Sequence, residues 1–137
     1  ETEKAFQSLV GKLFAKNYAR LGWDKVAGES AGDESLRGIV LSKTLYSENA
    51  DAKAKATQIF ATHQENLASF PADIRPIVLN IEIKTTRSAE LVKTYRETYI
   101  RTSLQEFKRE LEGAVALINA EKVMVELLES LKNADLV

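Results

Sequence analysis

A short apolar motif recurs in this chain at a fixed spacing. Residues 36–41 read LRGIVL and residues 74–79 read IRPIVL, an offset of 74 − 36 = 38 residues. A further step of 38 from residues 76–79 reaches residues 114–117, which read AVAL, again small and then apolar. A helical hairpin cannot bury its apolar face alone, so hairpins repeated at about this length must stack on one another. The repeat therefore predicts stacked pairs of helices, although short apolar matches also arise by chance in a helix-rich chain.

The apolar residues along the chain follow helical rather than strand spacing. Only two prolines and six glycines interrupt the pattern, and three of the glycines fall in a predicted loop at residues 22–32. We expect roughly seven amphipathic helices joined by short loops. The predicted buried faces are Phe6, Leu9, Val10, Leu13, Phe14 and Leu21; Leu36, Ile39 and Val40; Ala56, Ile59, Phe60, His63 and Leu67; Ile74, Ile77, Val78 and Ile81; Leu91, Val92, Tyr95 and Tyr99; Leu104, Phe107, Leu111, Val115 and Ile118; and Val123, Met124, Leu127, Leu128 and Leu131.

Several polar residues stand where helices would begin. Asp33 and Ser88 are predicted N-caps, because short polar side chains accept a hydrogen bond from a free backbone amide of the first turn. Ser103 and Glu106 have the spacing of a capping box. Asn119 is the predicted cap of a separate last helix.

Together these patterns predict an all-α fold of stacked antiparallel helix pairs, a HEAT-like α-solenoid or part of a right-handed α-α superhelix. Residues 1–137 are expected to form a single helical-repeat domain, itself a fragment of a larger one. The chain begins with Glu1, and Phe6 already lies in a helical pattern, which favours a piece cut from a longer protein. The alternative is a mature protein whose leader was removed.

Charge and composition exclude several classes of partner. The 19 basic and 20 acidic residues give a net charge of -1, so nothing favours nucleic acid or an anionic membrane. The sequence has no apolar run of the roughly 18 residues that a membrane span needs. Cysteine is absent, so no disulfide stabilises the fold, which is compatible with the cytoplasm.

The sequence contains few residues of the types that act in catalysis, with one histidine and no cysteine. A catalytic zinc usually takes three ligands from His, Cys and carboxylates, but the only histidine is His63, which lies on an apolar helix face and is expected to be structural. There is no H-E-x-x-H, no G-x-S-x-G and no phosphate-binding glycine loop. The chain is therefore predicted to be no enzyme by itself, with no catalytic residue, metal ligand or cofactor site.

A series of motifs resembles a known family. LGW at residues 21–23, GES at 28–30, LR at 36–37 and PADIRP at 71–76, followed by Ser88, Tyr95 and Ser103, resemble the C-terminal helical domain of zinc aminopeptidases. The resemblance implies a parent with a zinc-containing catalytic domain elsewhere and a helical domain that caps and shapes the substrate chamber. The parent would release N-terminal residues from peptides. After Tyr95 the match is loose, and we expect exposed apolar surface where further hairpins would stack.

Four residues of these motifs are candidates for facing peptide or another domain: Arg37, Arg75, Trp23 and Glu29. The two arginines are 75 − 37 = 38 residues apart and could bind a peptide carboxylate, or could pair with Asp33, Asp73 or neighbouring carboxylates. Trp23 could anchor an interface or fill the core beside the loop. Glu29 and Ser30 are expected to organise that loop through turn or cap hydrogen bonds.

Two functions remain open from the sequence. The first is a non-catalytic C-terminal domain of a zinc aminopeptidase, with the parent's catalytic domain and a peptide substrate as partners. The alternative is a free-standing helical-repeat scaffold for protein–protein interaction.

Overall fold

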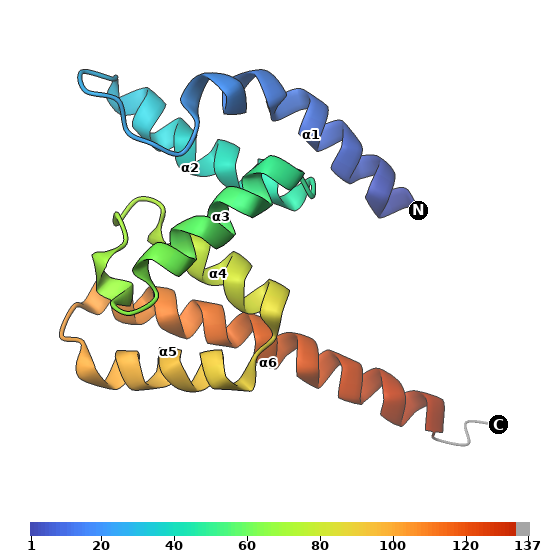
Figure 1. Ribbon diagram of the computed structural model, residues 1–137. Helices are drawn as coiled ribbons and strands as arrows, with labels where there is room; N and C mark the ends of the chain where they lie inside the picture. The colour runs from blue at the N-terminus through green and yellow to red at the C-terminus, as the bar shows by residue number, and fades with distance from the viewer. Residues whose placement is uncertain (134–137) are drawn as a thin grey trace. The chain divides into compact units, whose positions relative to one another are not determined.

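The computed structural model of the chain describes residues 1–133, apart from the side chains at positions 121, 131 and 133. The described part is all-α, as predicted, and contains six α-helices, a single 3-10 turn and no strand (Figure 1). The elements are α1 (Thr2–Leu21), α2 (Ala31–Tyr46), α3 (Ala50–His63), η1 (Leu67–Ser69), α4 (Arg75–Thr86), α5 (Ala89–Arg101) and α6 (Gln105–Asn133). No described helix is long and apolar enough to cross a membrane.

The chain divides into two compact units, residues 1–81 and residues 82–137. In the first unit α1 and α2 lie side by side and run in opposite directions, as Figure 1 shows. The open end of this hairpin is joined by the amide of Gln7, which donates to the Tyr46 carbonyl at 3.0 Å. The ring of Phe6 meets that of Tyr46 edge-on at 6.0 Å. The buried apolar residues of the unit are Val10, Leu21, Trp23, Val40, Leu41, Leu45, Ala52, Ala56, Phe60, Leu67, Phe70, Ile74, Val78 and Leu79.

In the second unit α5 and α6 form another antiparallel pair. Tyr95 of α5 is fully buried, and Phe107, Leu111 and Ala114 of α6 form one buried stripe at helical spacing. The ammonium of Lys108 lies 5.1 Å from the centre of the Tyr99 ring, a cation–π contact between the two helices.

The 38-residue repeat reappears in the pattern of burial. Val40 and Val78 occupy equivalent positions and are 1% and 0% exposed, as predicted. The neighbouring prediction is wrong: Ile39 is 53% exposed and Ile77 is only half-buried. Leu41 and Leu79, both fully buried, take their place. The repeat therefore faces the core through its last two apolar residues rather than its first two.

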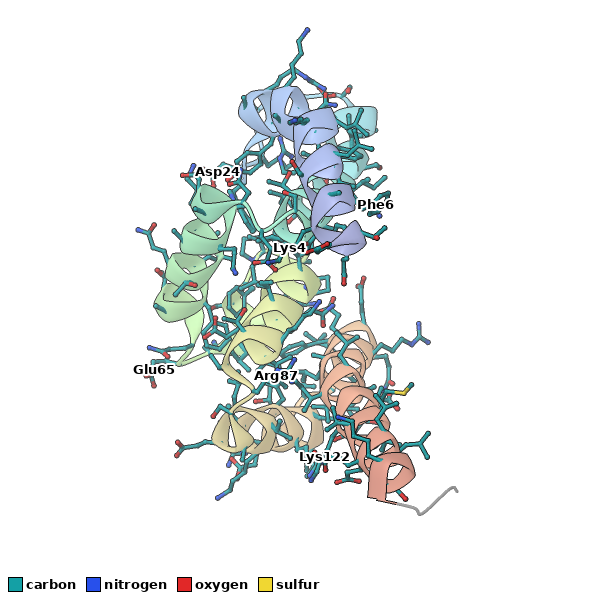
Figure 2. The ribbon with its side chains drawn as sticks, turned by 90° about the vertical axis from the view of Figure 1, so that its right-hand side faces the viewer. Lys4, Phe6, Asp24, Glu65, Arg87 and Lys122 are labelled. Carbon is teal, nitrogen blue, oxygen red and sulfur yellow. The ribbon has the colours of Figure 1, made fainter. Side chains whose placement is uncertain are left out.

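Other predicted core residues are also exposed. Helix α1 buries Val10 and Leu21, while Phe14 is half-buried and Phe6, Leu9 and Leu13 are exposed. The predicted core residues that are exposed are Phe6 (labelled in Figure 2), Leu9, Leu13, Ile39, Tyr99, Leu104, Val123, Met124, Leu127 and Leu128.

Three of the predicted caps are wrong and one is confirmed. Ser88 caps α5 by accepting from the Leu91 amide at 3.2 Å. Helix α2 is capped by Ser30 instead of Asp33, whose amide donates to the Ser30 hydroxyl at 3.1 Å. Helix α6 begins at Gln105, so Ser103 is not its N-cap. Asn119 lies inside α6, which joins the last two predicted helices into one.

Candidate functional site

Three of the four candidate residues, Trp23, Glu29 and Arg37, lie at the corner that joins α1 to α2. The corner begins at Gly22, with φ of 57°, and turns again at Gly28, with φ of 81°; both values suit glycine best. Ser30 then starts α2 as its N-cap. Residues 22–30 form a loop that is short of regular structure but rich in side-chain contacts.

The corner is fixed by an ion pair between Arg37 of α2 and Glu29 of the loop. The two terminal guanidinium nitrogens donate to the two carboxylate oxygens at 2.7 and 2.6 Å, and Nε donates to the Leu21 carbonyl at 3.3 Å. The Arg37 side chain is 1% exposed and that of Glu29 is 7% exposed. A planar guanidinium matches a carboxylate in this bidentate way, whereas a lysine ammonium cannot. Arg37 therefore ties the end of α1, the loop and α2 together.

The pair stays charged over the whole physiological range. Hydrogen bonds from Arg37 lower the pKa of Glu29 from its ordinary value of 4.5 to about 2. The same hydrogen bonds raise the pKa of Arg37, which the charge of Asp73 raises further. Asp73 thus lies near enough to act on the corner across a long sequence separation.

Trp23 anchors the loop through a chain of side chains. Its indole is 7% exposed, and Nε1 donates to the Tyr18 hydroxyl at 3.2 Å. That hydroxyl donates in turn to Oδ2 of Asp51 on α3 at 2.8 Å. Burial is the largest cause that raises the pKa of Tyr18, and the hydrogen bond from Tyr18 lowers the pKa of Asp51. Trp23 therefore links the loop to α1 directly and to α3 through the Tyr18 hydroxyl.

Two exposed ion pairs lie on the outside of the same corner. Both terminal nitrogens of Arg20 contact the carboxylate of Asp33 at 3.1 Å, and Nζ of Lys25 lies 2.9 Å from Oε1 of Glu34. Exposed pairs of this kind contribute little to stability. The Arg37–Glu29 pair is the buried connection, and Asp33, one of the expected partners of Arg37, belongs to Arg20.

Arg75 lies at the start of α4 and is 6% exposed, so it is buried as Arg37 is. Of the four candidates, the structure brings Arg37, Glu29 and Trp23 to the corner, while Arg75 lies in the second copy of the repeat, at the start of α4. In the chain alone the side chains of Arg37, Glu29 and Trp23 present little surface. Contact with peptide or with another domain stays a prediction for all four.

His63 contacts a hydroxyl group near the end of α3. Its Nδ1 lies 2.8 Å from the Ser69 hydroxyl, which itself donates to the Asn66 carbonyl at 2.6 Å. Which atom donates in the His63–Ser69 contact depends on the tautomer of the imidazole. The imidazole is half-buried and packs 4.9 Å from the Phe70 ring. Within residues 1–133, no group of three or more His, Cys, Asp or Glu side chains could hold a metal.

Sequence reasoning missed two parts of this corner. The Tyr18–Asp51 hydrogen bond joins residues 33 apart, and no spacing rule connects them. Ser30 was expected to help organise the loop, but its role as the cap of α2 was assigned to Asp33. The S-x-x-D spacing of these two residues is itself a cap signal that could have found it.

Comparison with known proteins gives consistent results. The family model of the ERAP1-like C-terminal domain matches residues 1–137. Aminopeptidase N of Lactococcus lactis subsp. cremoris is 90% identical over all 137 residues, and that of Lactobacillus delbrueckii subsp. lactis is 37% identical over the same length. Aminopeptidase N of Lactobacillus helveticus is 38% identical over 135 residues, 98% of the chain. The chain spans 16% of the length of each of these relatives. No solved structure gives a significant match.

Proposed function

Because this chain belongs to the ERAP1-like C-terminal domain family, we propose that it is the non-catalytic C-terminal part of an aminopeptidase, where it caps and shapes the substrate chamber. The parent would release N-terminal residues from peptides in the cytoplasm. The partners of the chain would be the catalytic domain of the same parent and the peptide in the chamber. Membrane and nucleic acid are not expected as partners. The observation that carries this proposal is the match of the whole chain to the domain family and to aminopeptidase N.

The chain's own chemistry supports a positioning role. At the corner, Arg37 and Glu29 are hydrogen-bonded to each other and Trp23 is hydrogen-bonded to Tyr18, all through part-buried contacts. Such an arrangement fixes the shape of a loop and activates no water or nucleophile. On its outer side the loop offers Val26, which is 59% exposed, to whatever lies opposite.

Zinc, if the parent uses it, would be bound outside this chain. Nδ1 of His63 lies 2.8 Å from the Ser69 hydroxyl, and the described residues hold no cluster of three potential ligands. A catalytic zinc site needs about three such ligands, so the donor set here does not fit the metal. We therefore expect the catalytic domain to supply every ligand.

The chamber role can be tested in the full-length parent by substituting the loop. We expect Val26→Arg to lower kcat/KM for a long peptide several-fold relative to a short aminoacyl reporter, because an added charge would obstruct entry to the chamber. The matched control is Ile100→Arg, on α5 at 77% exposure, which should leave the ratio unchanged.

Two results would contradict the proposal. If Val26→Arg and Ile100→Arg behave alike, the loop does not border the path of the peptide. If the short reporter loses as much activity as the long peptide, the loop affects the catalytic step rather than the admission of substrate.

A further inference from the structure

The α1–α2 hairpin is braced at both ends. Arg37 joins α2 to the end of α1 at the corner, and at the open end Gln7 donates to the Tyr46 carbonyl at 3.0 Å. Between these ends the two helices approach closely at Gly11, where an added Cβ would lie 3.2 Å from Cβ and Oγ of Ser47. These contacts should make the hairpin move as one body.

A strained turn leads from α2 into α3. Glu48 has a φ of 63°, in the left-handed region, which costs a residue with a side chain more than it costs glycine. The Asn49 amide reaches the Thr44 carbonyl at 3.4 Å, a long hydrogen bond, and the Ser47 hydroxyl donates to the same carbonyl at 2.6 Å. The closed turn therefore holds Glu48 in an unfavourable backbone conformation.

The last turn of α2 also contains a buried hydroxyl that lacks a hydrogen bond. Thr44 is 3% exposed, and its Oγ1 has no partner within residues 1–133. The threonines that donate to the carbonyl four residues earlier in their own helix are Thr57, Thr62, Thr86, Thr94 and Thr98. To donate to Val40 in the same way, Thr44 would have to rotate about χ1, and close packing opposes that rotation. The unpaired hydroxyl is a second feature that disfavours the closed turn.

Little apolar surface is buried by α3 next to this turn. The buried residues in the first two turns of α3 are both alanines, Ala52 and Ala56. Because the free energy of burial scales with apolar area, an alanine contributes much less than a leucine or a phenylalanine. Separation of α3 from the hairpin at this end would therefore expose few apolar atoms.

A hydrogen bond between side chains crosses from the hairpin to α3. The Tyr18 hydroxyl of α1 donates to Oδ2 of Asp51, in the first turn of α3, at 2.8 Å. The Asp51 side chain is 60% exposed. Water can replace an exposed hydrogen bond, so breaking this one costs much less than breaking the buried pair of Arg37 and Glu29. The contact can therefore open while the hairpin stays intact.

We propose that residues 47–49 form a hinge on which the α1–α2 hairpin swings away from α3, and that the Tyr18–Asp51 hydrogen bond is the catch that holds this hinge closed. Opening breaks the catch, relaxes the backbone of Glu48 and lets the Thr44 hydroxyl reach a partner. The hairpin carries the corner loop with it, so the loop takes two positions relative to α3. This inference concerns a motion within the chain and does not rest on the chamber role.

Hydrogen exchange in the full-length parent, measured by mass spectrometry without substrate, tests the hinge. The amides of Glu48 and Asn49 are bonded across the turn, so their exchange reports its opening. Tyr18→Phe removes the catch, and loss of one exposed hydrogen bond should speed their exchange about fivefold while the middle of α2 stays unchanged. The matched control is Tyr46→Phe, which removes a tyrosine hydroxyl from the same hairpin but not from the catch, and which should change neither segment.

A second measurement acts on the strain itself. Glu48→Gly and Glu48→Ala both remove the ion pair with Lys53, but only glycine accepts the positive φ without cost. After correction for intrinsic rates, exchange at Asn49 should be about threefold or more slower in Glu48→Gly than in Glu48→Ala.

Three results would overturn the hinge. The first is unchanged exchange at residues 48 and 49 in Tyr18→Phe. The second is faster exchange throughout α1 and α2 in that variant, which would show a general loss of stability. The third is exchange in Glu48→Gly that is as fast as in Glu48→Ala. Because no substrate is present, these outcomes are independent of the chamber proposal.

Discussion

Arg37 and Glu29 are eight residues apart, and their side chains meet through two parallel hydrogen bonds of 2.7 and 2.6 Å in a setting from which water is almost excluded. Arg37 also donates to the carbonyl of Leu21, the last residue of α1. A single side chain therefore contacts three consecutive segments. Removing it would leave a carboxylate buried without its cation, which is among the costlier defects in a folded protein.

The buried position of this pair should make it intolerant of lysine. We expect Arg37→Lys to lower the Tm of the chain clearly, because an ammonium cannot donate to both oxygens and to Leu21 at once. Arg20→Lys is the control, since Arg20 also binds a carboxylate with two nitrogens but is 51% exposed. It should change the Tm little. Similar losses in both variants would show that burial does not matter to the pair.

Glu29 should also make the chain sensitive to acid. Its pKa falls on folding from 4.5 to about 2, so its contribution to stability is complete above 4.5 and is lost as the pH falls toward 2. Urea unfolding between pH 7 and pH 2 should therefore show a difference in the free energy of unfolding between the chain and its Glu29→Gln variant, and this difference should become smaller below pH 4.5. Other carboxylates titrate in both proteins and cancel in this difference. A gap that is constant over the whole range would contradict the shifted pKa.

The Tyr18 hydroxyl is expected to stabilise the fold through the hydrogen bonds on either side of it. Tyr18→Phe would leave the buried indole of Trp23 without its acceptor, at a cost of about 1–3 kcal/mol in the free energy of unfolding. Tyr99→Phe keeps the ring that Lys108 contacts and should cost no more than about 0.5 kcal/mol. Equal stability of the two variants in urea would show that the hydrogen bonds joining Trp23, Tyr18 and Asp51 do not stabilise the corner.

Burial within the repeat can be tested on neighbouring residues of α2. Leu41 is fully buried, so Leu41→Ala should cost about 2–5 kcal/mol. Ile39, two residues earlier, is 53% exposed, and Ile39→Ala should cost about 0.5 kcal/mol or less. Thermal or urea unfolding of the chain decides between them. A larger loss of stability in Ile39→Ala than in Leu41→Ala would show that Ile39 faces the core, as the sequence pattern predicted.

The error at Ile39 shows what periodicity can resolve. The repeat contains three consecutive apolar residues in each copy, at positions 39–41 and 77–79. A helix turns by about 100° per residue, so three in a row cannot all face one core. The pattern predicted Val40 and Val78 correctly, but the choice between their neighbours depends on which side the partner helix lies. That choice is made by packing between segments distant in the sequence.

Helix boundaries failed for a different reason. Asn119 is a good cap in isolation, yet nothing in residues 114–133 is a glycine or proline that would force a break. The chain therefore continues as one helix through Asn119, a residue that can cap a helix but does not force it to end. At the corner, by contrast, Gly22 and Gly28 carry positive φ values, and the predicted loop at residues 22–32 is confirmed except for its last two residues, which belong to α2.

The site was partly predictable because one of its contacts is local. Arg37 was expected to pair with Asp33, Asp73 or a neighbouring carboxylate, and Glu29 was expected to organise the loop; the structure pairs Arg37 with Glu29, while Asp33 binds Arg20. The Tyr18–Asp51 contact depends on how α3 lies against α1, and it cannot be predicted from the identity of either residue.

The contacts at the corner join residues that are close in sequence, and this affects the order in which the helices fold during synthesis. Glu29, Leu21 and Asp33 lie within 16 residues of the arginines that bind them. Contacts of such short range close quickly, since little chain entropy is lost in forming the loop between them. The α1–α2 hairpin can therefore assemble on the nascent chain once residue 46 has left the ribosome, before α3 is available. It would then offer later helices a formed surface on which to fold.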